Sequence, residues 1–149
     1  MALISSAHRP GPGDPDGGLE LSVAATPESA YRFRLRFSEW LDATISVDAE
    51  RRSDIILAVY EAVANAAEHA YASQEAPGSI GVRARVTPAG ELEAAVTDTG
   101  TWKPGHSDQF RGRGLALLTA LSDDSEVTTG PSGTAVTLRW HLVRDGARV

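Results

Sequence analysis

The 149 residues carry a formal net charge of −6, contain no cysteine, and are 42% hydrophobic and 23% charged. This length and composition predict one globular domain, and they exclude a disulfide framework or a thiolate metal site. The acidic balance argues against nucleic acid as the main ligand, and no apolar run approaches the length of a membrane helix. We therefore expect a cytoplasmic protein that contacts neither nucleic acid nor membrane.

The first 18 residues of the chain are rich in proline and glycine. They predict a disordered tail or linker ahead of a domain over residues 19–149, and such a lead-in would also suit one domain of a longer polypeptide. The alternation over residues 19–25 predicts a strand. Thr26 is a typical N-cap and Pro27 a typical first helical residue, so a helix should run to about residue 42.

A longer helix is predicted from about residue 48 to residue 72, followed by strands and one more helix. The remaining predicted elements are a hairpin of strands 79–86 and 91–98 with its turn at 88–90, a loop over 99–111, a glycine-led helix within 112–123, and strands near 126–129 and 134–142. Adjacent strand pairs and interspersed helices predict an α+β two-layer sandwich. Its sheet should be mixed but mostly antiparallel, with helices on one face.

The stretch "EAVANAAEHAY" places polar side chains on one side of the second helix. At 100° per residue, Asn65 lies about 40° from Glu61 and Glu68 about 20° to the other side. A carboxylate can accept a proton, and an Asn oxygen is a hard ligand suited to Mg²⁺. The same pattern is also that of a solvated helix face, so this segment alone leaves both interpretations open.

Two further segments have residues suited to nucleotide binding. "VTDTG" ends a strand with Asp98, whose carboxylate could accept a hydrogen bond from an exocyclic amine, and Gly100 would let a flat base come close. "RGRGLALL" places Gly112 and Gly114 at the start of a helix, where free amides bind phosphate. Each segment has a plainer interpretation, as a turn and as a glycine-rich helix entry. Likewise "SGTAVTL", with Thr134, is in isolation an ordinary turn and strand start.

Taken together in this order, the motifs resemble those of the GHKL ATPase superfamily, with its Bergerat fold. "EAVANAAEHAY", "VTDTGTWKP", "RGRGLALLTALSD" and "GTAVTL" are most similar to the anti-sigma-factor serine/threonine kinases of the RsbW/SpoIIAB type, and the resemblance covers about residues 19–142. Trp102 and Pro104 in the short loop resemble the versions found in multidomain phosphatase–kinase regulators.

The resemblance implies roles for particular residues, with ATP and Mg²⁺ as ligands. Glu61 would be the general base, Asn65 would hold Mg²⁺, and Asp98 would recognise the adenine amine beside Gly100. Loop 101–111 would be the ATP lid, Glu68 would be solvated, and His69 would have a structural role. The remaining nucleotide contacts would come from the phosphate-binding Gly-x-Gly-Leu motif and its flanking arginines and from the late Gly-Thr motif, namely Arg111, Gly112, Arg113, Gly114, Leu115 and Thr134.

The resemblance also implies an enzyme, a protein serine/threonine kinase. It would phosphorylate an anti-anti-sigma (STAS) partner and sequester an alternative sigma factor. Homodimers are common in the family, so the resemblance also allows a homodimer. The alternative is a non-catalytic nucleotide-binding partner-switch module, which would have no need of a base at Glu61. A histidine-kinase catalytic domain is disfavoured because His8 lies in the proline- and glycine-rich tail and not on a dimerising helix.

Overall fold

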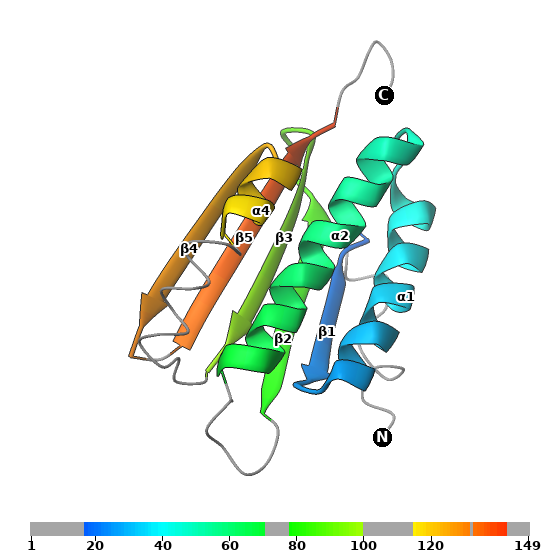
Figure 1. Cartoon of the computed structure of the whole chain (residues 1–149). Helices are drawn as coiled ribbons and strands as arrows, with labels where there is room; N and C mark the ends of the chain where they lie inside the picture. Colours follow the sequence, from blue (N-terminus) through cyan, green and yellow to red (C-terminus); the bar gives the residue numbers. More distant parts are fainter. Residues whose placement is uncertain (1–16, 71–77, 100–114, 132, 143–149) are drawn as a thin grey trace.

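The structure is a computed structural model that describes residues 17–70, 78–99, 115–131 and 133–142 (Figure 1). Within these ranges the chain forms five strands, three α-helices and a π turn. In chain order they are β1 (Leu19–Ala24), α1 (Pro27–Thr44), α2 (Ala49–Asn65), the π turn η1 (Ala66–Ala70), β2 (Ser79–Val86), β3 (Glu91–Asp98), α4 (Leu115–Leu121), β4 (Asp124–Gly130) and β5 (Gly133–His141).

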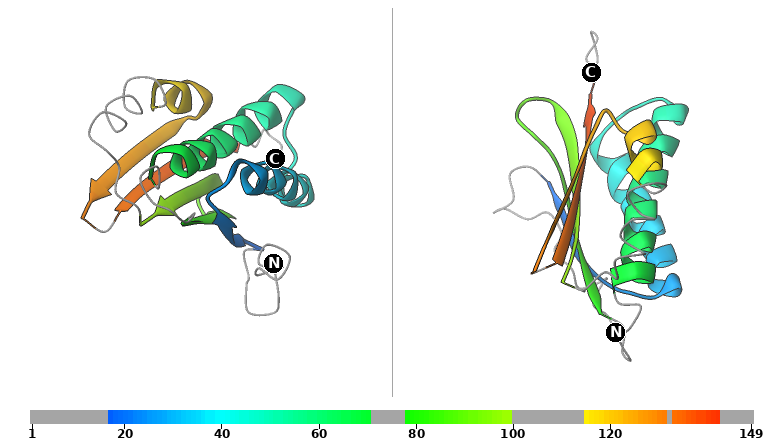
Figure 2. Two further views of the ribbon diagram at one scale, coloured as in Figure 1. Left: turned by 60° about the horizontal axis from the view of Figure 1, so that its bottom comes forward. Right: turned by 60° about the vertical axis from the view of Figure 1, so that its left-hand side comes forward.

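The five strands form one sheet in the order β1-β2-β3-β5-β4, and every pairing is antiparallel. Strand β5 lies between β3 and β4, which run in the same direction and are connected through α4. The helices cover one face of the sheet (Figure 2). The predicted α+β two-layer sandwich is confirmed, and the described sheet is wholly antiparallel where a mixed one was expected.

The helix starts follow from local chemistry; the N-cap Thr26 was predicted as such, and the second helix was predicted to start near residue 48. Thr26 caps α1, because its Oγ1 accepts a hydrogen bond from the Ser29 amide at 3.1 Å, and Pro27 is the first helical residue. Asp48 caps α2 in the same way, with its Oδ1 2.7 Å from the Arg51 amide. Each such cap typically contributes about 1 kcal/mol to stability.

The core lies between the sheet and the helices. Alternate residues of β1, β2, β3 and β5 point toward the helices and are buried, while their neighbours face the other side. Phe33, Phe37 and Trp140 are fully buried, and the indole N–H of Trp140 donates to the Leu121 carbonyl at 2.8 Å. That hydrogen bond joins the end of α4 to β5. No helix in the described ranges is long and apolar enough to cross a membrane.

The second helix departs from prediction at its C-terminal end. We expected one continuous helix to about residue 72, but the α-helix ends at Asn65 and continues as the π turn Ala66–Ala70. The Ala66 amide is shared between the Ala62 and Val63 carbonyls. A π turn holds more residues per turn than an α-helix, so the angles computed for Glu61 and Asn65 hold and that for Glu68 does not.

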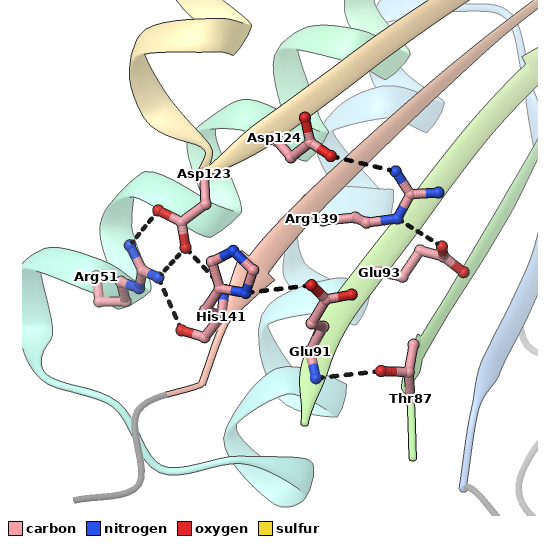
Figure 3. A network of polar contacts seen from close by, with 8 residues as sticks. All are labelled: Arg51, Thr87, Glu91, Glu93, Asp123, Asp124, Arg139 and His141. Atoms are coloured by element: carbon pink, nitrogen blue, oxygen red, sulfur yellow. Dashed lines mark hydrogen bonds and ion pairs between the residues drawn. The ribbon is translucent and has the colours of Figure 1, made fainter. Parts of the chain in front are cut away.

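A polar network at one end of the sheet joins the start of α2 to the end of β5 (Figure 3). Arg51 forms two hydrogen bonds with the Asp123 carboxylate, and its Nη2 donates to the His141 carbonyl at 2.9 Å. The His141 amide donates to Asp123 Oδ2 at 2.7 Å, and the His141 ring lies 3.1 Å from the Glu91 carboxylate. Partial burial raises the pKa of Asp123, but the Arg51 and His141 hydrogen bonds and the Arg51 charge outweigh it and hold that pKa below its usual value.

Asp123→Asn is expected to lower the free energy of unfolding at pH 7 by about 1 kcal/mol, because it removes a half-buried charge-assisted pair. The folded-state pKa lies below the unfolded value of about 3.9, so the contribution is fully present above that pH and is lost as pH falls through the folded pKa. Urea unfolding between pH 7 and pH 2 should therefore show a shallower acid dependence in the variant. Asp124→Asn, which changes the exposed neighbouring carboxylate, is the control. An equal change in the free energy of unfolding of both variants would contradict the stabilising role of Asp123.

Candidate functional site

Two polar side chains interrupt the apolar, helix-facing side of the sheet. Asp98 is the last residue of β3 and Thr134 the second residue of β5, and they are direct partners across the two strands. Both are buried, with 6% and 5% of their surface exposed. The preceding pair on the same face is Val96 and Val136, which is apolar. The tertiary structure thus brings together two candidate residues that lie 36 positions apart in the sequence.

The Thr134 hydroxyl has an unmet hydrogen-bonding requirement. Within the part of the chain that the structure describes, its Oγ1 is the buried side-chain oxygen that has no hydrogen-bond partner. An unsatisfied buried polar atom typically costs about 1–3 kcal/mol. A ligand that brings a donor or acceptor to this point would recover that cost, so the residues here fit a polar flat group such as a nucleobase.

Gly133 allows β5 to begin this close to Asp98, a role that the sequence pattern did not reveal. Its φ is +130°, and a Cβ at this position would lie 1.9 Å from the Asp98 carbonyl oxygen and 2.8 Å from the Thr99 Cα. Both the backbone angle and the contact therefore require glycine. The result is that Thr134 is held beside Asp98.

Gly133→Ala is expected to destabilise the fold by more than about 2 kcal/mol, because the added methyl group must displace the Asp98 backbone and the φ is strained for an L-residue. Nucleotide affinity should fall as well, since Asp98 and Thr134 would separate. Gly130→Ala is the matched control: Gly130 pairs with Gly133 across the β4–β5 hairpin, and a Cβ there meets nothing within 4 Å. Thermal unfolding of both variants checks this, and equal stabilities would refute the steric argument.

The C-terminal end of α2 lies at the same end of the sheet as the end of β3 and the start of β5 (Figure 1). Both α2 and η1 pack against β3. Glu61 and Asn65 are half-buried, whereas Glu68 on η1 is exposed. The candidate helix face and the Asp98–Thr134 pair therefore approach one region of the molecule from three secondary structure elements, α2, β3 and β5.

The structure says less about the other candidate residues of the nucleotide site. Leu115 begins α4, and nothing is described of its side chain. The structure does not describe residues 100–114, so the predicted lid lies outside it, as do Gly100, Arg111, Gly112, Arg113 and Gly114. Among the described residues, no three His, Asp or Glu side chains are grouped as a metal site.

Comparison with known proteins identifies the family of this domain. Residues 23–140 match the family described as the histidine kinase-like ATPase domain. The chain belongs to this family, and an ATPase domain implies ATP binding.

A solved structure extends the comparison. The chain is similar to the crystal structure of the RsbU and RsbW domains of Rv1364c from Mycobacterium tuberculosis, with 32% sequence identity and a TM-score of 0.69. The match covers 89% of this chain and 34% of that chain, so this chain spans about a third of the length of that relative. The expected GHKL resemblance of the RsbW type is confirmed at the level of domain and fold.

Proposed function

We propose that this domain is a protein serine/threonine kinase that binds Mg·ATP, phosphorylates an anti-anti-sigma (STAS) partner and sequesters an alternative sigma factor. The observation that supports this proposal most is the buried Asp98–Thr134 pair. The pair lies at the end of an otherwise apolar sheet face, in a chain of the ATPase family. The RsbW domain of the solved relative supports the choice of a partner-switching kinase within that family.

Asp98 and Thr134 would bind the adenine. The Asp98 carboxylate accepts a hydrogen bond from the exocyclic amine, and the Thr134 hydroxyl donates or accepts at the same edge, directly or through water. Gly100 would let the base lie close to the backbone. Arg111, Gly112, Arg113, Gly114 and Leu115 would surround the phosphates, the arginines balancing their charge.

Glu61 would act on the substrate hydroxyl. Its carboxylate accepts the proton of the Ser or Thr hydroxyl while that oxygen forms the new bond to the γ-phosphorus, the bond from phosphorus to the ADP oxygen breaks, and ADP leaves with those electrons. Asn65 would offer its amide oxygen to Mg²⁺, which neutralises phosphate charge when bound.

The exposed face of α1 supports a protein partner. Tyr31 and Leu35 lie one turn apart and are 57% and 51% exposed, which is unusual for large hydrophobic side chains. Arg32 and Arg36 lie beside them, and within the described residues neither has an ion pair. The exposed apolar pair, with these arginines and the exposed Glu28 and Glu39 on the same side of the helix, fits a partner surface that carries both apolar and charged groups.

The proposal is tested by incubating the protein with γ-labelled ATP, Mg²⁺ and candidate STAS proteins. Label on a Ser or Thr of the partner is expected, with transfer and partner capture both reduced in Arg32→Glu. Arg83→Glu, which alters an exposed arginine of β2 on the opposite face of the sheet, is the charge-matched control. Nucleotide binding with no transfer to any partner would favour the non-catalytic partner-switch module, and absence of nucleotide binding would refute both.

Asn65→Ala is expected to weaken Mg·ATP binding about tenfold while metal-free ATP binds as before, because the change removes one metal ligand and leaves the base contacts. The half-buried position at the end of α2 should tolerate alanine, so thermal unfolding should change little. Calorimetric titration with and without Mg²⁺ measures both affinities. A wild-type affinity that does not depend on the metal would remove Asn65 from this role.

A further inference from the structure

The polar pair at the end of β3 and β5 is part of a longer row across the sheet. Thr134 is the partner not only of Asp98 but also of Thr129 on β4, while Ile80 on β2 pairs with Asp98 from the other side. Ile80 is fully buried, Asp98 and Thr134 are nearly so, and Thr129 is exposed. Along this row from β2 to β4, the side chains thus change from apolar and buried to polar and exposed.

Thr129 lies on the same face of the sheet as Asp98 and Thr134. Alternate residues of a strand point to one face, and Val127, two positions before Thr129, packs against the core beneath the helices. Val127 pairs with Val136, so the neighbouring row on this face is apolar. Thr128 points to the opposite face, which no described helix covers (Figure 2). Two adjacent exposed threonines of β4 therefore lie on opposite faces of the sheet.

We propose that the Thr129 hydroxyl hydrogen-bonds the nucleoside part of the bound nucleotide and so extends the adenine site onto β4. This inference rests on the proposed function. Two strand spacings separate Thr129 from Asp98, about 10 Å between backbones. In this arrangement a base whose amine is held at Asp98 lies across Thr134 toward β4, where Thr129 is exposed. Its hydroxyl is placed for the far edge of the base or the ribose.

The test compares ATP and ADP affinities of the wild type, Thr129→Val, Thr129→Ser and the control Thr128→Val. Valine keeps the shape and strand preference of threonine but removes the hydroxyl. Losing one hydrogen bond should weaken binding about two- to tenfold. The loss should be the same for ATP and ADP, because the contact is to the nucleoside and not to the γ-phosphate. Thr129→Ser should retain most of the affinity, and Thr128→Val should bind as the wild type does.

Three results would overturn the inference: unchanged affinity in Thr129→Val, an equal loss in Thr128→Val, or a loss in Thr129→Ser as large as in Thr129→Val. The last would show that the affinity does not follow the hydroxyl, because serine keeps the hydroxyl. Thermal unfolding of each variant without nucleotide identifies a change in the fold itself, which would also count against the inference if it accounted for the loss. Failure of the proposed function is distinct, because the wild type would then bind neither nucleotide.

Discussion

Glu61→Gln is expected to retain nucleotide affinity and to lose phosphoryl transfer by about 10²- to 10⁴-fold, the usual effect of removing a positioned base. The amide is nearly the same size as the carboxylate, so the half-buried position at the last full turn of α2 should keep its packing. The loss would be smaller where positioning and charge stabilisation dominate the rate. Capture of a sigma factor should persist, because holding a partner requires no proton acceptor. Transfer from ATP to the STAS partner and a parallel nucleotide titration measure the two properties.

The matched control is Glu68→Gln. Glu68 is the exposed glutamate of the π turn, and its neutralisation removes the same charge close to the same helix end. It should transfer phosphate at nearly the wild-type rate. If Glu61→Gln also transfers at that rate, the polar side of α2 is a solvated helix face. If it loses nucleotide binding together with transfer, Glu61 has a structural or metal-associated role instead.

Asp98→Asn should weaken adenine-nucleotide binding by about 10- to 100-fold, because hydrogen bonds to a charged acceptor contribute about 1.5–3 kcal/mol. The asparagine can present its NH₂ group where the adenine amine needs an acceptor. The wild type should bind GTP poorly for a related reason, since guanine carries a carbonyl oxygen in place of that amine. The buried position of Asp98 makes the discrimination strong, because water cannot replace the lost partner.

Fluorescence or calorimetric titration with ATP and GTP checks this prediction, with Asp124→Asn at the other end of the sheet as a charge control. Equal affinity of the wild type for ATP and GTP would contradict the role of Asp98. A fold defect in Asp98→Asn would appear in its unfolding curve without nucleotide, and the GTP comparison in the wild type does not depend on that variant.

Local patterns were sufficient to predict most of the elements. The hairpin strands Ser79–Val86 and Glu91–Asp98 were predicted at their observed bounds, because alternation and a proline–glycine turn are short-range signals. Gly90, with φ of +86°, completes that turn. The cap Thr26 and the start of the second helix near residue 48 were predicted from equally local signals. For the site, the sequence supplied the candidates Glu61, Asn65, Asp98 and Thr134, but their roles remain predictions.

Only the tertiary structure decided which distant residues meet. Insertion of β5 between β3 and β4 pairs Asp98 with Thr134 and Thr134 with Thr129, and no periodicity in the chain specifies that strand order. A Cβ on Gly133 would clash with the Asp98 backbone beside it, a contact between residues far apart in the chain. The π turn after Asn65 likewise departs from the continuous helix that the local pattern predicted, and it packs against β3. Sequence patterns report short-range preferences, whereas register and close approach follow from packing between elements distant in the chain.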